Sequence, residues 1–165
     1  MILPMKTIEI VGKHYCGTAV HTRIACRGVV LRGDAILLSH ELNTGWYLIP
    51  GGGLEGEESP EECCIREIQE ETGYLVRPLE RYLTLQENYG EWCYISHYFL
   101  CEELGRTEAR LTELEAQRGL IPEWVQLEDA RAIFSEHVNL AHYEEKRGSY
   151  QREALALKVF REEVR

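Results

Sequence analysis

The chain has 165 residues, of which 44% are apolar, a composition that supports a folded core and excludes a disordered chain. Its 18 lysines and arginines stand against 28 aspartates and glutamates, so the net charge is −10. Nucleic-acid polymers and anionic membranes are therefore not expected partners, whereas an anionic small molecule is compatible if a divalent cation lies between it and the protein. The length predicts one domain over residues 1–165.

The six cysteines include no C-x-x-C pair, which argues against a zinc ribbon or a thioredoxin-like site. We expect reduced thiols that pack as small apolar side chains. Residues 1–5 are too short for the apolar part of a signal peptide, and no apolar run is long enough to span a bilayer. The sequence therefore predicts a cytoplasmic protein.

The first half of the chain predicts a β-hairpin followed by a short strand. Residues 22–32 are rich in β-branched and apolar types, Gly33-Asp34 makes a turn, and residues 35–39 return. A short apolar run at residues 46–49 is stopped by Pro50 and three glycines.

The second half predicts further strands and two helices. Residues 77–86 and 92–101 are strand candidates joined by a loop that contains Asn88 and Gly90. Residues alternate along the second of these, so its two faces meet different neighbours. A last strand is predicted at 123–127, and helices at 127–134 and 150–163. The pattern indicates an α+β protein or an α/β/α sandwich around a mixed β-sheet.

The strongest helix prediction covers residues 60–72. Ser59 is a good N-cap, Pro60 suits the first helical position, and Glu62 completes a capping box. Gly73 suits the left-handed position that closes a helix.

One side of this helix is predicted to pack on a sheet and a neighbouring face to carry acids. The packing side holds Cys64, Ile65, Ile68 and Thr72. Glu67, Glu70 and Glu71 gather on the neighbouring face, and Arg66 lies at the i,i+4 position from Glu70. Glu58, in the loop before the helix, can fold back toward the same group.

Such an acidic face is destabilising unless a cation relieves it. Carboxylates and water in an open octahedral arrangement suit Mg²⁺ or Mn²⁺, with substrate phosphates completing the coordination. The preceding Gly51, Gly52 and Gly53 allow backbone amides to approach a ligand closely. An E-x-x-E-E segment alone is usually a solvated helix face, but the glycine loop, the capped helix and the one-sided acids together favour a metal-dependent site.

This segment resembles the signature of the Nudix hydrolases, G-x5-E-x7-R-E-U-x-E-E-x-G-U, where U is a bulky aliphatic residue. The match runs over residues 52–74 and fixes eight positions: Gly52, Glu58, Arg66, Glu67, Ile68, Glu70, Glu71 and Gly73. Tyr74 departs from the aliphatic final position but is bulky and apolar. The resemblance implies an α/β/α sandwich around a mixed sheet, and hydrolysis of a nucleoside diphosphate linked to another group X.

The resemblance also implies roles for these residues. Glu67, Glu70 and Glu71 would hold Mg²⁺ or Mn²⁺, Glu58 would support them, and Arg66 would orient the carboxylates. One of the glutamates, or a carboxylate outside the motif, would act as general base. Glu115 is the candidate outside the motif, although a charged surface loop is the simpler interpretation of its segment.

The sequence says little about substrate recognition. Tyr89, Trp92 and Tyr98 are able to stack on a base, but such aromatic residues more often pack in the core or on the surface. Arg152 is able to reach a phosphate or to remain an ordinary exposed arginine. Because no basic stripe is visible, we expect a small diphosphate such as a nucleotide sugar or a nucleoside triphosphate, not capped RNA. A homodimer is left open.

Two other functions compete with hydrolysis. One is a non-catalytic Nudix-like module that binds a nucleotide and regulates a partner, although degenerate motifs usually mark such modules. The other is an isomerase of isoprenoid diphosphates, which would need a cysteine in the site, and Cys93 and Cys101 have no distinguishing context.

Overall fold

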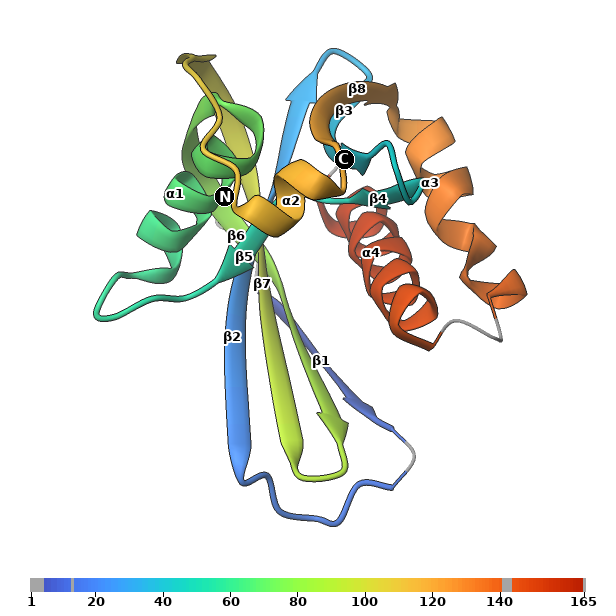
Figure 1. The fold of residues 1–165 in the computed structure, drawn as a ribbon. Helices are drawn as coiled ribbons and strands as arrows, with labels where there is room; N and C mark the ends of the chain where they lie inside the picture. The colour runs from blue at the N-terminus through green and yellow to red at the C-terminus, as the bar shows by residue number, and fades with distance from the viewer. Residues whose placement is uncertain (1–4, 13, 141–143, 165) are drawn as a thin grey trace.

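The computed structural model describes residues 5–12, 14–140 and 144–164, which form a mixed sheet flanked by helices (Figure 1). The strands are β1 (Lys6–Val11), β2 (His21–Arg32), β3 (Ala35–Glu41), β4 (Trp46–Leu48), β5 (Gly51–Gly53), β6 (Tyr74–Tyr89), β7 (Trp92–Arg106) and β8 (Leu120–Gln126). The helices are α1 (Pro60–Thr72), α2 (Glu113–Gln117), α3 (Leu127–Ser135), the 3₁₀ turn η1 (Glu136–Asn139) and α4 (Glu144–Glu163). No helix in these described ranges is long and apolar enough to cross a membrane.

The strands follow the order β1-β6-β7-β2-β3-β4, with β5 added to β2 and β8 added to β3. The pairs β1–β6 and β2–β7 are parallel and the others antiparallel, so the sheet is mixed. The predicted hairpin is confirmed, but β2 and β3 pair only next to their turn, at Leu31–Ile36 and Arg32–Ala35. Farther from the turn β2 instead takes the glycine strand β5 as its neighbour, at Ala25–Arg27.

Helices cover both faces of the sheet, as the α/β/α interpretation predicts. In Figure 1, α1 lies to one side of the strands, and α3 and α4 lie to the other. Under α1, a core cluster includes Cys26, Ile68 and Phe99. On the α4 side, a larger cluster includes Tyr98 and Phe160. Tyr98 and its neighbour Phe99 therefore point to opposite faces, which confirms the predicted alternation along β7.

The α1 helix has the predicted bounds and caps. Ser59 Oγ accepts a hydrogen bond from the Glu62 amide at 3.1 Å, and Glu62 Oε2 accepts one from the Ser59 amide at 2.9 Å. Gly73 closes the helix with φ 77°, and a Cβ there would lie 2.4 Å from the carbonyl oxygen of Thr107. Both the conformation and the contact therefore require glycine.

Several predicted boundaries need correction. Asn88 lies in β6, not in a loop, because its backbone pairs with Cys93 of β7 and with Val11 of the unpredicted strand β1. The turn between β6 and β7 is reduced to Gly90 and Glu91. Helix α4 begins at residue 144, before the predicted 150. Strand β5 was not predicted because its three residues are all glycine, which has low β propensity.

The cysteine prediction is confirmed. All six are free thiols, and five are buried. Cys63 and Cys64 both face the core beneath α1, and Cys64 Sγ lies 3.8 Å from Cys101 Sγ. Cys63 thus belongs to the packing side of the helix, which the sequence assigned to Cys64, Ile65, Ile68 and Thr72.

Candidate active site

The glycine strand β5 lies directly against the acidic helix. A Cβ on Gly52 would sit 2.3 Å from Glu67 Oε2, so the Glu67 carboxylate occupies the space above the Gly52 Cα. The backbone of Gly52 does not adopt a positive φ, and the requirement for glycine is one of close approach. A Cβ on Gly53 would meet nothing closer than Arg23 Nη2 at 3.7 Å, an ordinary contact.

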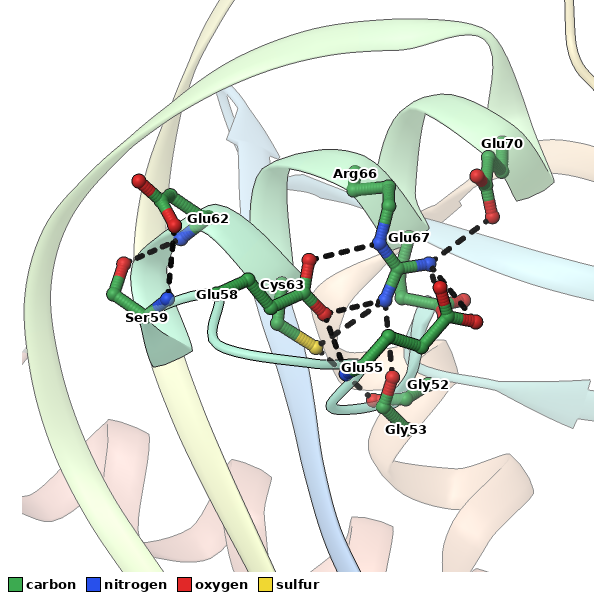
Figure 2. A network of polar contacts seen from close by, with 10 residues as sticks. All are labelled: Gly52, Gly53, Glu55, Glu58, Ser59, Glu62, Cys63, Arg66, Glu67 and Glu70. Atoms are coloured by element: carbon green, nitrogen blue, oxygen red, sulfur yellow. Dashed lines mark hydrogen bonds and ion pairs between the residues drawn. The ribbon is translucent and has the colours of Figure 1, made fainter.

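Arg66 is the centre of the motif (Figure 2). Its guanidinium donates to both carboxylate oxygens of Glu58, at 2.6 and 3.0 Å, and to Glu67 at 2.7 Å. It also donates to Glu70 at 3.2 Å and to the carbonyl oxygen of Gly53 at 3.0 Å. The hydrogen bonds from Arg66 lower the pKa of Glu58 to about 2. One cation therefore ties the loop, the glycine strand and two helical carboxylates together.

Glu71 has different hydrogen-bond partners from Glu58, Glu67 and Glu70, although the charge of Glu67 still acts on it. Its carboxylate accepts hydrogen bonds from Ser39 Oγ of β3 at 3.0 Å and from the amide of Gly51 at 3.3 Å. Burial raises the pKa of Glu71 to about 8, and the charge of Arg27 partly offsets this effect. Arg66 and Arg27 thus act on different motif carboxylates.

The donor set of the motif fits Mg²⁺ or Mn²⁺. In the described residues, no three His, Cys, Asp or Glu side chains already converge as a metal-binding group, because Arg66 stands among Glu58, Glu67 and Glu70. Mg²⁺ needs only one or two protein carboxylates, since water and substrate phosphates complete its coordination. Burial raises the pKa of Glu67 despite its bonds to Arg66, so a further cation beside that carboxylate would be favourable.

Glu115 lies on α2 and has a structural partner. Its carboxylate accepts a hydrogen bond from the amide of Thr112 at 2.9 Å, while Thr112 Oγ1 accepts one from the Glu115 amide at 3.2 Å. This reciprocal pair is a capping box that the sequence analysis did not recognise. The charge of Glu115 nevertheless adds to the effect of burial on the pKa of both Glu67 and Glu71. Its candidacy as general base stays a prediction.

A large cleft lies next to the motif. Its volume is about 1180 Å³, and strands β1, β2, β6 and β7 form one wall while α4 contributes to the other. The motif carboxylates do not line it. Arg27, directly opposite Gly51 in the β2–β5 pairing, and Arg23, next to Gly53, connect the cleft to the glycine strand.

The cleft gathers positive charge in an acidic protein. Five arginines line it: Arg23, Arg27, Arg118, Arg147 and Arg152. Three glutamates line it as well: Glu41, Glu87 and Glu145. The sequence showed no basic stripe, and it did not predict that these arginines meet in one cleft. The five arginines are scattered over the sequence: two lie on β2, two on α4, and Arg118 follows α2 and pairs with Glu41 of β3.

The four residues considered for substrate contact have different positions. Tyr89 lines the cleft and is 37% exposed, whereas Trp92 is 42% exposed outside the cleft lining and stacks on Tyr94. Tyr98 is fully buried, and its hydroxyl donates to Glu153 at 2.5 Å, so it belongs to the core. Arg152 is not an ordinary exposed arginine: it lines the cleft and pairs with Glu153 at 3.5 Å.

The sequence analysis missed several cleft residues, above all Arg23, Arg27 and Trp46. A signal was present in β2, where Arg23, Ala25 and Arg27 alternate with the apolar Ile24 and Cys26. Two arginines on one face of a strand whose other face is apolar indicate a polar surface on that side. No described cysteine lines the cleft, which removes the feature that an isoprenoid diphosphate isomerase would need.

Tyr74, the departure from the motif, has a packing role. Its ring meets Trp124 of β8 edge-on with centroids 5.5 Å apart, and Trp124 Nε1 donates to its hydroxyl at 3.0 Å. The guanidinium of Arg106 lies 5.1 Å from the ring centroid. A bulky buried residue is retained at this position, with a hydrogen bond that an aliphatic residue would lack.

A model of the NUDIX domain matches residues 21–147 of this chain. An ADP-ribose pyrophosphatase of Bacillus subtilis is 39% identical over 82 residues, which cover 50% of this chain and 44% of that protein. A MutT-like protein of Streptomyces ambofaciens is 32% identical over 103 residues, 62% of this chain and 66% of that protein. The chain thus spans less than half of the Bacillus subtilis relative.

Solved structures share the fold. A NUDIX hydrolase from Nitrosomonas europaea superposes with a TM-score of 0.56 at 23% identity, over 67% of this chain and 76% of that one. An ADP-ribose pyrophosphatase from Streptococcus suis gives a TM-score of 0.51 at 21% identity, over 64% and 75%. These likenesses confirm the predicted mixed α/β architecture.

Proposed function

Because the chain belongs to the NUDIX domain family, we propose that it hydrolyses the diphosphate bond of a nucleoside diphosphate linked to another group. The observation that carries this proposal is the position of the glycine strand β5. The Glu67 carboxylate lies against Gly52. Arg27 of β2 is opposite Gly51 in the β2–β5 strand pairing, and its side chain lines a cleft that contains five arginines. A diphosphate bound in the cleft would therefore reach the carboxylates across β5.

We propose the following roles for the motif. Glu67 and Glu70, with Glu58 in support, would hold Mg²⁺ or Mn²⁺, and Glu71 would join them from its position beside Gly51. The cation would neutralise the diphosphate and acidify a water for attack at phosphorus. Arg66 fixes the positions of the Glu58, Glu67 and Glu70 carboxylates relative to the Gly53 carbonyl, because it donates hydrogen bonds to all four groups. The general base is one of these carboxylates or Glu115.

The cleft supports a substrate with two moieties on its diphosphate. Its volume of about 1180 Å³ exceeds the common range for small-molecule pockets of roughly 300–1,000 Å³. Its ends also differ: Trp46 and Arg118 lie at the β4 and α2 end, and Tyr89 and Tyr94 at the β6–β7 turn. Two curated relatives are named ADP-ribose pyrophosphatases, which supports a nucleotide-sugar type of substrate over a nucleoside triphosphate.

The extent of the domain, the compartment and the size of the substrate are also proposals. We propose that residues 1–165 act as one domain, because Phe160 of α4, outside the matched region, packs in the same core cluster as Leu83 of the sheet. The six free thiols support a reducing compartment such as the cytoplasm. The positive charge lies within the cleft, which favours a small diphosphate over a nucleic-acid polymer.

A panel of diphosphates tests the function. ADP-ribose, nucleotide sugars and nucleoside triphosphates are each incubated with the protein and Mg²⁺, and released monophosphate, pyrophosphate or phosphate is measured. We expect cleavage of at least one diphosphate-linked compound, loss of activity in EDTA, and recovery with Mg²⁺ or Mn²⁺. Full activity after exhaustive EDTA dialysis would contradict the metal requirement. Tight binding of a nucleotide without turnover would favour the non-catalytic module instead.

A further inference from the structure

Two of the five arginines that line the cleft lie on β2. Arg23 and Arg27 are four positions apart on one strand, so both point to the same face, and both line the cleft. Gly53 lies opposite Ala25 in the β2–β5 pairing, two residues or about 7 Å along the strand from Arg27. Arg23 Nη2 reaches back to 3.7 Å from the point that a Cβ on Gly53 would occupy. The two side chains therefore bracket the glycine strand.

These two guanidiniums have no carboxylate partner among the described residues. Arg66, Arg118 and Arg152 each form ion pairs within the protein. Arg27 instead donates through Nη1 to the carbonyl oxygen of Ile49 at 3.0 Å, and its buried Nε has no hydrogen-bond partner. Arg23 is exposed in the cleft. Both retain donors and a full positive charge for an anion.

The surroundings of Arg27 favour a phosphate over a carboxylate of the protein. The Glu71 carboxylate is close enough for the charge of Arg27 to act on it, but Glu71 receives its hydrogen bonds from Ser39 and Gly51. Arg27 thus lines the cleft while its buried Nε has no hydrogen-bond partner among the described residues. Planar guanidiniums bind phosphate oxygens through two parallel hydrogen bonds, which fixes orientation as well as position.

We propose that Arg23 and Arg27 form a clamp that binds the two phosphates of the substrate and holds the diphosphate across β5. Arg27 takes the phosphate next to Gly51 and Glu71, and Arg23 takes the phosphate next to Gly53. The clamp offsets repulsion between the diphosphate and a protein of net charge −10. This inference rests on the proposed function for its substrate, but its binding step requires no metal.

The test compares Arg23→Gln, Arg27→Gln and Arg27→Lys with a matched control, Arg81→Gln. Arg81 lies on β6 outside the cleft lining, where its Nη1 is 3.4 Å from His97 Nδ1. Dissociation constants for ADP-ribose and for inorganic pyrophosphate are measured by calorimetry in EDTA. KM and kcat are measured with Mg²⁺ for the diphosphate that the wild type cleaves best, and melting curves verify folding.

We expect each Gln variant to raise both dissociation constants and KM by about 10- to 100-fold, the usual effect of losing a charge-assisted hydrogen bond. Arg27→Lys keeps the charge but loses the planar fork, so it should fall between wild type and Arg27→Gln. Arg81→Gln should match the wild type. If Arg27→Gln does not fold, Arg23→Gln and Arg27→Lys decide the question.

Dissociation constants and KM values equal to those of Arg81→Gln in all three variants, Arg23→Gln, Arg27→Gln and Arg27→Lys, would overturn the clamp. The outcome is separable from the proposed function. A wild type that cleaves no diphosphate would contradict the hydrolase proposal, yet pyrophosphate binding that disappears in Arg27→Gln would still support the clamp.

Discussion

The arginines on the two sides of the glycine strand β5 differ in whether carboxylates of the protein neutralise them. On the α1 side, Arg66 donates to three carboxylates and a carbonyl, so the charges of the motif are largely paired within the protein. On the cleft side, within the part of the chain that the structure describes, Arg27 donates to the Ile49 carbonyl and keeps a buried Nε without a partner. Arg66 and Arg27 flank the same three glycines, but only the charge of Arg27 is not already paired with a carboxylate of the described residues.

This contrast separates a positioning region from a binding region. A guanidinium surrounded by Glu58, Glu67 and Glu70 is held rigidly, and it fixes the carboxylates that would meet a metal. A guanidinium without an anionic partner has lost part of its hydration and gains most when an anion arrives. Substitutions on the two sides should therefore affect different measurements.

Removal of a motif carboxylate, Glu70 or Glu71, should give the largest loss of kcat among these predictions. We expect Glu70→Gln and Glu71→Gln each to lower kcat by roughly 100- to 1,000-fold, because several kcal/mol of charge stabilisation at the metal would be lost. Metal-free stability should stay level or rise in Glu71→Gln, since a buried carboxylate is replaced by a neutral amide. In Glu70→Gln, whose side chain is 40% exposed, it should fall by at most about 0.5 kcal/mol.

Steady-state kinetics in Mg²⁺ give kcat. Urea unfolding in EDTA gives the free energy of unfolding without metal. Glu102→Gln is the control, because Glu102 pairs with Arg77 on the surface, away from the motif. If both motif variants lose several kcal/mol of metal-free stability, Glu70 and Glu71 are structural residues and the contrast between the two regions is wrong.

Arg66→Gln should combine a loss of activity with a loss of stability. Without the guanidinium, Glu58 and Glu67 stay largely buried with no cation, and such broken networks cost about 2 kcal/mol or more. We expect a lower urea midpoint in EDTA, partly restored by Mg²⁺, and kcat reduced by about 100-fold. Arg23→Gln on the cleft side should leave the midpoint unchanged. Equal midpoints for the two variants would erase the distinction.

Gly52→Ala should damage activity more than stability. Its new methyl group would enter the space of the Glu67 carboxylate, 2.3 Å away, and that flexible group can move at a cost of about 1 kcal/mol or less. A displaced Glu67 no longer meets Arg66 or a metal correctly, so kcat should fall by roughly 10-fold or more. Gly105→Ala on β7 is the matched control, because its Cβ would meet nothing within 4 Å and its φ is not positive. Wild-type kinetics in Gly52→Ala would show that Glu67 has no fixed position in catalysis.

The motif helix could be predicted from the sequence because its signals are local. Ser59, Glu62 and Gly73 lie within or beside the element that they cap, and their hydrogen bonds follow from spacing alone. The helical wheel placed Glu71 beside Glu67, and the charge of Glu67 does act on the pKa of Glu71. What the wheel did not predict is the hydrogen bond that Glu71 accepts from Ser39 of β3. That contact depends on tertiary packing, which a helical period does not contain.

The cleft could not be predicted for the same physical reason. Arg23 and Arg152 meet it from β2 and α4, which are far apart in the sequence and are brought together by the parallel β2–β7 pairing and the packing of α4. A parallel pair needs a long connection and leaves no turn signal in the sequence. Net charge was also misleading, because −10 describes the whole chain and the cleft has the opposite balance.

The smallest expected effect concerns Arg81 and its neighbour, because Arg81 also has no carboxylate partner among the described residues but lies outside the cleft. Its neighbour is His97, whose Nδ1 lies 2.8 Å from Thr84 Oγ1 and 3.4 Å from Arg81 Nη1. Burial lowers the pKa of His97, Arg81 lowers it further, and Glu61 opposes them. Burial and the nearby charge of Arg81 therefore favour the neutral imidazole. An arginine without a carboxylate thus need not be a binding residue when a neutral acceptor is beside it.

The pH dependence follows from the direction of this shift. The unfolded chain protonates His97 near its ordinary pKa of about 6.5, whereas the folded protein resists protonation until a lower pH. The unfolded state therefore binds more protons in that window, and the free energy of unfolding falls as the pH drops below about 6.5. We expect wild type to lose up to about 1 kcal/mol relative to His97→Gln between roughly pH 7.5 and 5.5, measured by urea unfolding. His137→Gln, on the η1 turn, serves as the control. A wild-type stability that rises relative to His97→Gln on acidification would mean that His97 is stabilised as the charged ring, and Arg81 would then need an anion nearby.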